Sequence, residues 1–110
     1  MDTFQQRLEQ EQSQLHQQLT ARLIELGASS QVLAALAQQG FDGIADFLPE
    51  LPDRQLYALC QRLGKVEAAL CQIEQGVYGI CCDCEAEIDM ARLVADPAEQ
   101  RCHHCDDKAV

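Results

Sequence analysis

The 110-residue chain carries 18 acidic and 8 basic side chains, which gives it a formal net charge of −10 at pH 7. This length is typical of one domain, and this charge disfavours direct binding to DNA or RNA, because nonspecific affinity for a phosphate backbone comes from Lys and Arg. No apolar run approaches the roughly 18 residues that a membrane span needs, and the N-terminus lacks the basic and apolar blocks of a secretory signal, so we expect a cytoplasmic protein that does not enter a membrane.

Residues 2–26 are predicted to form one long amphipathic helix. The segment is rich in Gln, Glu, Leu and Arg, which favour helix. Its apolar side chains recur at helical spacing, at Phe4, Leu8, Leu15, Leu19, Leu23 and Leu26. Gly27 provides a stop for this helix.

Short helices are predicted in the connection that follows. Ser29 or Ser30 can cap a helix over QVLAALAQQ that ends at Gly40, and DGIADFL is expected to form a second short turn. Pro52 suits the first turn of a further long helix, which is predicted over about residues 52–75 and is expected to end at Gly76.

This second long helix has the clearest periodicity in the chain. Its apolar seam follows three-four spacing at Leu56, Leu59, Leu63, Val66, Leu70 and Ile73. The seam needs a partner, and residues 2–26 have the matching length, so we predict an antiparallel helical hairpin. A weaker stripe on the same helix contains Tyr57, Cys60, Gly64, Ala68 and Cys71. Either the middle segment covers this stripe, or its small residues are half-exposed.

Four cysteines after Gly76 have the spacing of a metal site. The pattern is Cys81, two residues, Cys84, seventeen residues, Cys102, two residues and Cys105. Two such pairs form two tight turns that can hold one tetrahedral Zn²⁺. Four cysteine ligands fill the coordination sphere, so we expect one structural zinc and no enzymatic activity.

The remaining cysteines and histidines of this region have other expected roles. Cys82 is separated from Cys84 by one residue, which is too few for a metal-binding turn, and His103 and His104 are expected to point into solvent. A redox role for the two cysteine pairs is the alternative to zinc, but the strand-helix-strand context of such motifs is absent. Cys60 and Cys71 lie on a helix and are expected to be packing residues.

Taken together, these patterns predict a mostly α fold. It consists of an antiparallel helical hairpin with short intervening helices over residues 1–76, and a small C-terminal four-cysteine zinc finger over residues 77–110.

The finger sequence resembles a known family. Residues 73–105, IEQGVYGICCDCEAEIDMARLVADPAEQRCHHC, are similar to the DksA/TraR family of bacterial zinc-finger transcription regulators. The shared features are an Ile-Glu-x-Gly-x-Tyr-Gly lead-in, two cysteine pairs at this separation, a Glu-Ile after the first pair, and an Ala-Arg-Leu and a Pro before the second. The resemblance includes the upstream RLGKVEAAL, and nothing comparably close is present in residues 1–55.

The resemblance implies a regulator that binds RNA polymerase rather than DNA and has no chemistry of its own. In this family the hairpin enters the secondary channel, and acidic residues at its tip approach the catalytic centre. The candidate tip acids here are Asp42, Asp46, Glu50 and Asp53. Glu50 and Asp53 are at the tip if the short helices fold back along the hairpin, whereas Asp42 and Asp46 are at the tip if these helices extend it. Helix capping or solvation is the alternative role for all four.

The resemblance also bears on basic contacts and on an effector. Lys65 and Arg92 fall at positions that are basic in the family's best-known member, where polymerase contact and guanosine tetraphosphate binding occur. Asp96 and Asp106 replace two positive charges there, and like-charge repulsion therefore predicts independence from this nucleotide. We expect a monomer. The alternative function is a zinc-stabilised helical interaction module with a different protein partner.

Overall fold

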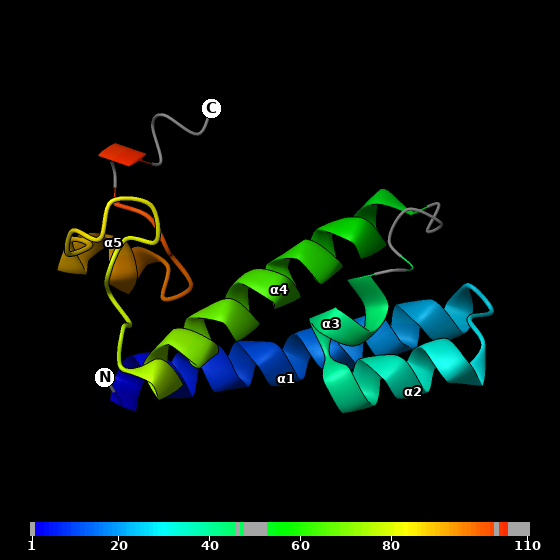
Figure 1. The fold of residues 1–110 in the computed structure, drawn as a ribbon. Helices are drawn as coiled ribbons and strands as arrows, with labels where there is room; N and C mark the ends of the chain where they lie inside the picture. Colours follow the sequence, from blue (N-terminus) through cyan, green and yellow to red (C-terminus); the bar gives the residue numbers. More distant parts are fainter. Residues whose placement is uncertain (1, 46, 48–52, 103, 106–110) are drawn as a thin grey trace.

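The computed structural model describes residues 2–45, 47, 53–102 and 104–105. In chain order its helices are α1 (Asp2–Glu25), α2 (Ser30–Gln39), α3 (Phe41–Ile44), α4 (Arg54–Gln75) and α5 (Met90–Ala95) (Figure 1). We call the long helices α1 and α4 the stalk and residues 77–105 the finger. None of the helices in the described ranges has the length and apolar character that crossing a membrane requires.

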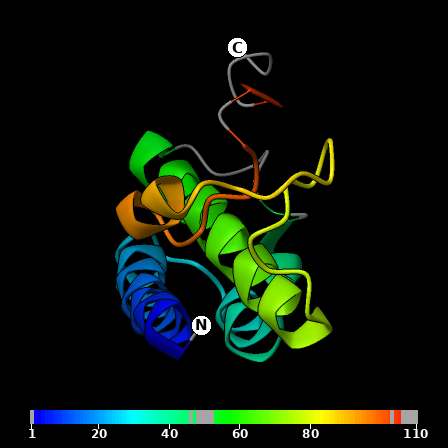
Figure 2. The ribbon, with the colours of Figure 1, turned by 90° about the vertical axis from the view of Figure 1, so that its left-hand side faces the viewer.

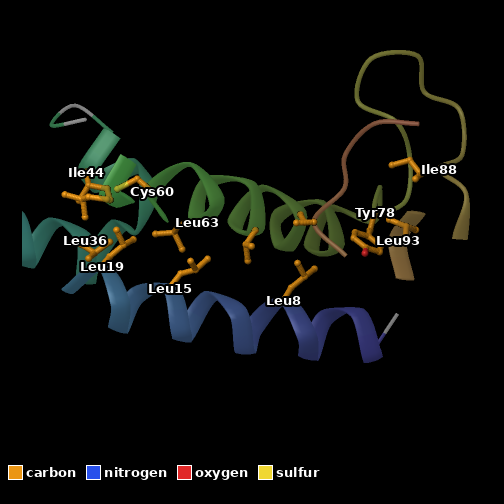
Figure 3. Packing of buried hydrophobic residues seen from close by; sticks show 14 of the residues in the cluster. Leu8, Leu15, Leu19, Leu36, Ile44, Cys60, Leu63, Tyr78, Ile88 and Leu93 are labelled. Carbon is orange, nitrogen blue, oxygen red and sulfur yellow. The ribbon is translucent and has the colours of Figure 1, made fainter. Parts of the chain in front are cut away.

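The predicted hairpin is confirmed: α1 and α4 are antiparallel and pack along their leucine seams (Figures 1 and 3). The side chains that meet at this seam are almost fully buried, namely Leu8, Leu15, Leu19 and Leu23 from α1 and Leu56, Leu63 and Val66 from α4. Burying one such side chain contributes about 1.5–3 kcal/mol. The apolar seam is therefore the main source of cohesion between the two long helices.

Glycines end both long helices in the same way. At Gly27, where φ is 77°, the Ala28 amide donates to the Leu23 carbonyl at 2.9 Å and the Gly27 amide donates to Ile24 at 3.0 Å. This pair of bonds is a Schellman motif, which requires a left-handed residue. Gly76, also at φ 77°, repeats it, with Val77 donating to Gln72 at 2.9 Å. The predicted helix stops are thus confirmed.

The start of α4 lies slightly later than the sequence predicted. Asp53 is its N-cap and accepts a hydrogen bond from the Gln55 amide at 2.9 Å, so the helix begins at Arg54. Pro52, which was expected in the first turn, lies outside the described residues. The cap of α2 agrees with expectation, because the Ser29 hydroxyl accepts from the Val32 amide.

The short helices α2 and α3 fold back along the stalk rather than extending it. Viewed along the helices, α1 and α2 lie side by side and α4 runs obliquely past them (Figure 2). Leu36 and Ile44 bring α2 and α3 into the apolar core, next to the fully buried Cys60 (Figure 3). The weak stripe on α4 is covered only in its middle, since Tyr57 and Cys71 at its ends are exposed.

Candidate metal centre

The four predicted ligands converge at the finger. The Sγ atoms of Cys81, Cys84, Cys102 and Cys105 all lie within 4.8 Å of one another, and those of Cys84 and Cys102 are 3.6 Å apart. Sulfurs bound to one tetrahedral Zn²⁺ at about 2.3 Å lie about 3.8 Å from each other. The cluster therefore fits a single zinc ion, which would be held by all four thiolates.

Backbone hydrogen bonds shape the first of the two turns that carry these ligands. The Cys81 amide donates to the Ala86 carbonyl at 2.8 Å, and the Glu85 amide donates back to Cys81 at 3.0 Å. Glu85 adopts a left-handed φ of 64°, which turns the chain after Cys84. The Cys82 amide donates to Gln100 at 2.9 Å and joins the first turn to the segment that leads into the second.

The electrostatics of the cluster favour a cation. Hydrogen bonding from the Cys102 backbone amide lowers the pKa of the Cys81 thiol to about 6, so this group is readily a thiolate. The pKa of the Cys105 thiol is raised, chiefly by its hydrogen bond with Cys84, because neighbouring sulfurs cannot all be charged together. A divalent cation removes this conflict, since it stabilises four thiolates at once.

Among the described residues, the other cysteines and His104 are not members of the cluster. Cys82 is exposed, with its Sγ 3.8 Å from Asp83 Oδ1, and His104 is exposed as well. His103 lies outside the described residues. In the stalk, burial raises the pKa of the Cys60 thiol to about 11, which makes it an unreactive packing residue, whereas Cys71 is exposed.

Apart from the sulfurs, the finger has a small apolar core. It contains Tyr78, Ile88, Leu93 and Ala98. The Tyr78 hydroxyl donates to the Pro97 carbonyl at 2.7 Å, and its ring lies against Phe4 of α1, with 6.0 Å between centroids. So few buried residues cannot hold a domain together alone, and metal binding therefore dominates the stability of the finger.

The two basic residues singled out by resemblance both lie next to acids. Lys65 Nζ is 3.5 Å from an Asp96 carboxylate oxygen, and Arg92 is 3.4 Å from Glu99. The same Asp96 also accepts two hydrogen bonds from Arg62, at 2.9 and 3.0 Å. Sequence reasoning missed Arg62, because a single arginine on a half-buried helix face carries no recognisable pattern.

The structure describes two of the four candidate tip acids, and these two lie on different elements. Asp53 is at the end of the stalk far from the finger, where it caps α4 and pairs with Arg22 of α1. Asp42 is exposed on α3, partway along the stalk (Figure 1). Asp46 and Glu50 lie outside the described residues, so the structure places neither of them.

A helical stalk that ends in a four-cysteine cluster defines a zinc-finger protein with a structural metal centre. Residues 76–109 match the family described as prokaryotic dksA/traR C4-type zinc finger. This part of the chain is therefore a DksA/TraR C4-type zinc finger, as the sequence resemblance predicted, and its four clustered cysteines fit one structural zinc. No curated protein and no solved structure matches the chain.

Proposed function

We propose that this protein regulates transcription by binding RNA polymerase through the secondary channel, without contacting DNA. The observation that carries the proposal is the DksA/TraR finger at residues 76–109, attached to one end of a two-helix stalk. The net negative charge of the chain disfavours direct contact with nucleic acid, which agrees with binding to the polymerase itself. Regulation then comes from occupancy of the channel and needs no reaction at the zinc.

The proposed action is independent of guanosine tetraphosphate. Arg62 and Lys65, which could attract a polyphosphate, are both bonded to Asp96. A nucleotide that approached these cations would have to displace this carboxylate, and it would meet an additional negative charge. Asp106, the second replaced position, lies outside the described residues.

The acids that would approach the polymerase centre remain Asp42, Asp46, Glu50 and Asp53 in this proposal. Because α2 and α3 fold back along the stalk, the end of α4 that carries Asp53 is at the distal end. Asp53 itself is paired with Arg22. We therefore rank Glu50, which lies shortly before Asp53 in the sequence, above Asp42 as the acid that acts in the channel. Lys65 and Arg92 are the basic residues proposed to lie towards the polymerase rim.

Retention on immobilised core RNA polymerase, followed by abortive initiation at a ribosomal promoter, tests this proposal. The zinc-loaded protein should be retained at micromolar concentration and should change the yield of short transcripts equally with and without guanosine tetraphosphate. Cys84→Ser, which removes one ligand, should lose both effects, whereas the matched variant Cys82→Ser should keep them. Failure of the zinc-loaded protein to bind would remove the polymerase proposal.

A second candidate function is a zinc-stabilised interaction module with a different protein partner. It is favoured by the covering of one side of the hairpin by α2 and α3, which makes the body more compact, and by the pairing of Asp53 with Arg22. Under this alternative, polymerase binding is absent although the zinc stoichiometry and the helical content are unchanged.

A further inference from the structure

The finger is joined to the stalk by one covalent connection, at Gly76, yet it is held by a second and noncovalent attachment. At its centre is Arg62 of α4, whose guanidinium lies between two carboxylates. Its Nε and one terminal nitrogen donate to Glu11 of α1 at 2.5 and 2.9 Å, and its two terminal nitrogens donate to Asp96 of the finger at 2.9 and 3.0 Å. We call these three residues the Arg62 network.

The geometry of this network is well suited to fixing an orientation. A guanidinium is planar and has five N–H donors in a rigid arrangement, so two bidentate carboxylates define the positions of both partners in its plane. The three side chains are each about one-third exposed, which limits screening by salt. Asp96 is itself held in place, because its Oδ1 accepts from the Ala98 amide at 3.0 Å.

Other contacts cross the same boundary, including the ring contact of Phe4 with Tyr78, but each is a single contact and does not define an orientation in a plane as paired hydrogen bonds do. The Gln100 side-chain amide donates to the Lys65 carbonyl at 2.8 Å, and Arg7 of α1 donates to the Val94 carbonyl at 3.0 Å. None of these groups belongs to the cysteine cluster. The attachment of the finger to the stalk is therefore distinct from the metal that folds the finger.

We propose that the Arg62 network is an orientation lock, in which Asp96 fixes the direction of the finger relative to the stalk through contacts that the zinc ligands do not make. Arg62 and Asp96 are positioning residues in this inference. With the lock intact, finger and stalk tumble as one rigid body; without it, the finger keeps its zinc and its internal fold but reorients about Gly76.

Residual dipolar couplings of backbone amides in the full-length, zinc-loaded protein test the lock directly. One alignment tensor should describe stalk and finger in the unmodified protein. In Asp96→Asn, the couplings of the finger should be smaller in magnitude than those of the stalk and should require a separate tensor. Asparagine still accepts from the Ala98 amide, so the local fold of the segment is retained.

Two further variants serve as a control for charge and as a second test of the paired hydrogen bonds. Glu99→Gln removes the same charge from the same segment, but Glu99 bonds to Arg92 and Arg101 within the finger, so a single tensor should persist. Arg62→Lys keeps the positive charge but cannot hold two carboxylates by paired bonds, and it should release the finger as Asp96→Asn does. All variants should retain one zinc. A single tensor in both Asp96→Asn and Arg62→Lys would overturn the proposal.

The lock also has a consequence that rests on the proposed function. If finger and stalk contact polymerase together, loss of their fixed orientation adds an ordering cost to binding, and Asp96→Asn should weaken binding by about 3- to 10-fold relative to Glu99→Gln. A protein that does not bind polymerase at all would remove the proposed function, while the dipolar couplings would still decide the lock.

Discussion

The ring of Phe41 lies directly over Gly64. A Cβ atom placed on Gly64 would come within 3.1 Å of the ring, which is closer than ordinary van der Waals contact. Glu67, one turn further along α4, accepts a hydrogen bond from the Phe41 amide at 2.8 Å. The start of α3 is thus fixed to α4 by one apolar and one polar contact.

Enlarging residue 64 should therefore detach α3. We expect Gly64→Leu to lower the free energy of unfolding by about 1–3 kcal/mol, because the side chain must displace Phe41. Ala58→Leu, at an exposed position of the same helix, is the matched control and should stay within about 0.5 kcal/mol of the unmodified protein. Urea denaturation followed by circular dichroism measures both. Equal stability of the two variants would mean that Phe41 does not pack on α4 in solution.

Removal of zinc should unfold the finger before the stalk. The finger has few buried apolar residues besides its cysteines, whereas the stalk has a continuous leucine seam. Chelation should release one zinc per chain, measured by mass spectrometry, and amide exchange should become fast in the finger but stay slow in α1 and α4. Retained protection throughout the metal-free finger would show that zinc is not needed for its fold.

Thiol alkylation should divide the seven cysteines into three groups. In the zinc-loaded protein Cys71 and Cys82 should react quickly, the four ligands should react only after chelation, and Cys60 should react only on unfolding. Burial raises the pKa of the Cys60 thiol from 9.0 to about 11. Keeping this thiol neutral therefore contributes its full amount to the folding stability below about pH 9, and this contribution is lost as the pH rises through about 11. Peptide mass spectrometry after timed alkylation gives the order. Reaction of Cys60 as fast as Cys71 would contradict its buried position.

The distal end of the stalk should depend on Asp53. The Arg22 guanidinium, by its hydrogen bond, lowers the pKa of the Asp53 carboxyl, and the carboxylate also caps α4. A lowered folded-state pKa means that the contribution of Asp53 is present above the ordinary carboxyl pKa and is lost as the pH falls through the lowered value. At neutral pH we expect Asp53→Ala to reduce Tm more than Asp53→Asn, which can still cap the helix. Asp42→Ala, at an exposed position on α3, should have little effect on Tm.

The sequence predicted those parts of the fold that depend on local patterns. The leucine spacing of α1 and α4, the glycines at positions 27 and 76, and the cysteine spacing each have a direct physical meaning, and all three appear in the structure. The sequence does not determine whether the middle helices fold back, since a stripe as weak as that around Gly64 does not decide between burial and half-exposure.

The junction between finger and stalk could not be predicted in this way. In the sequence Asp96 indicates only a charge that repels a nucleotide, whereas in the structure it is a partner of Arg62. In the sequence Arg62 is 34 positions from Asp96 and 51 positions from Glu11. No periodicity links them, because such contacts arise only once the hairpin and the finger have both folded.

Zinc and Arg62 constrain the same stretch of chain. The metal holds both ends of residues 85–101 through Cys84 and Cys102, and Asp96 attaches this stretch to α4 between those ends. Whichever constraint forms first shortens the free loop that the other must close, so the entropy lost in the second closure is smaller. Metal affinity and finger docking are therefore cooperative. Weakening the ion pair between Arg62 and Asp96 should make zinc exchange faster at the four cysteines, although none of them contacts Arg62.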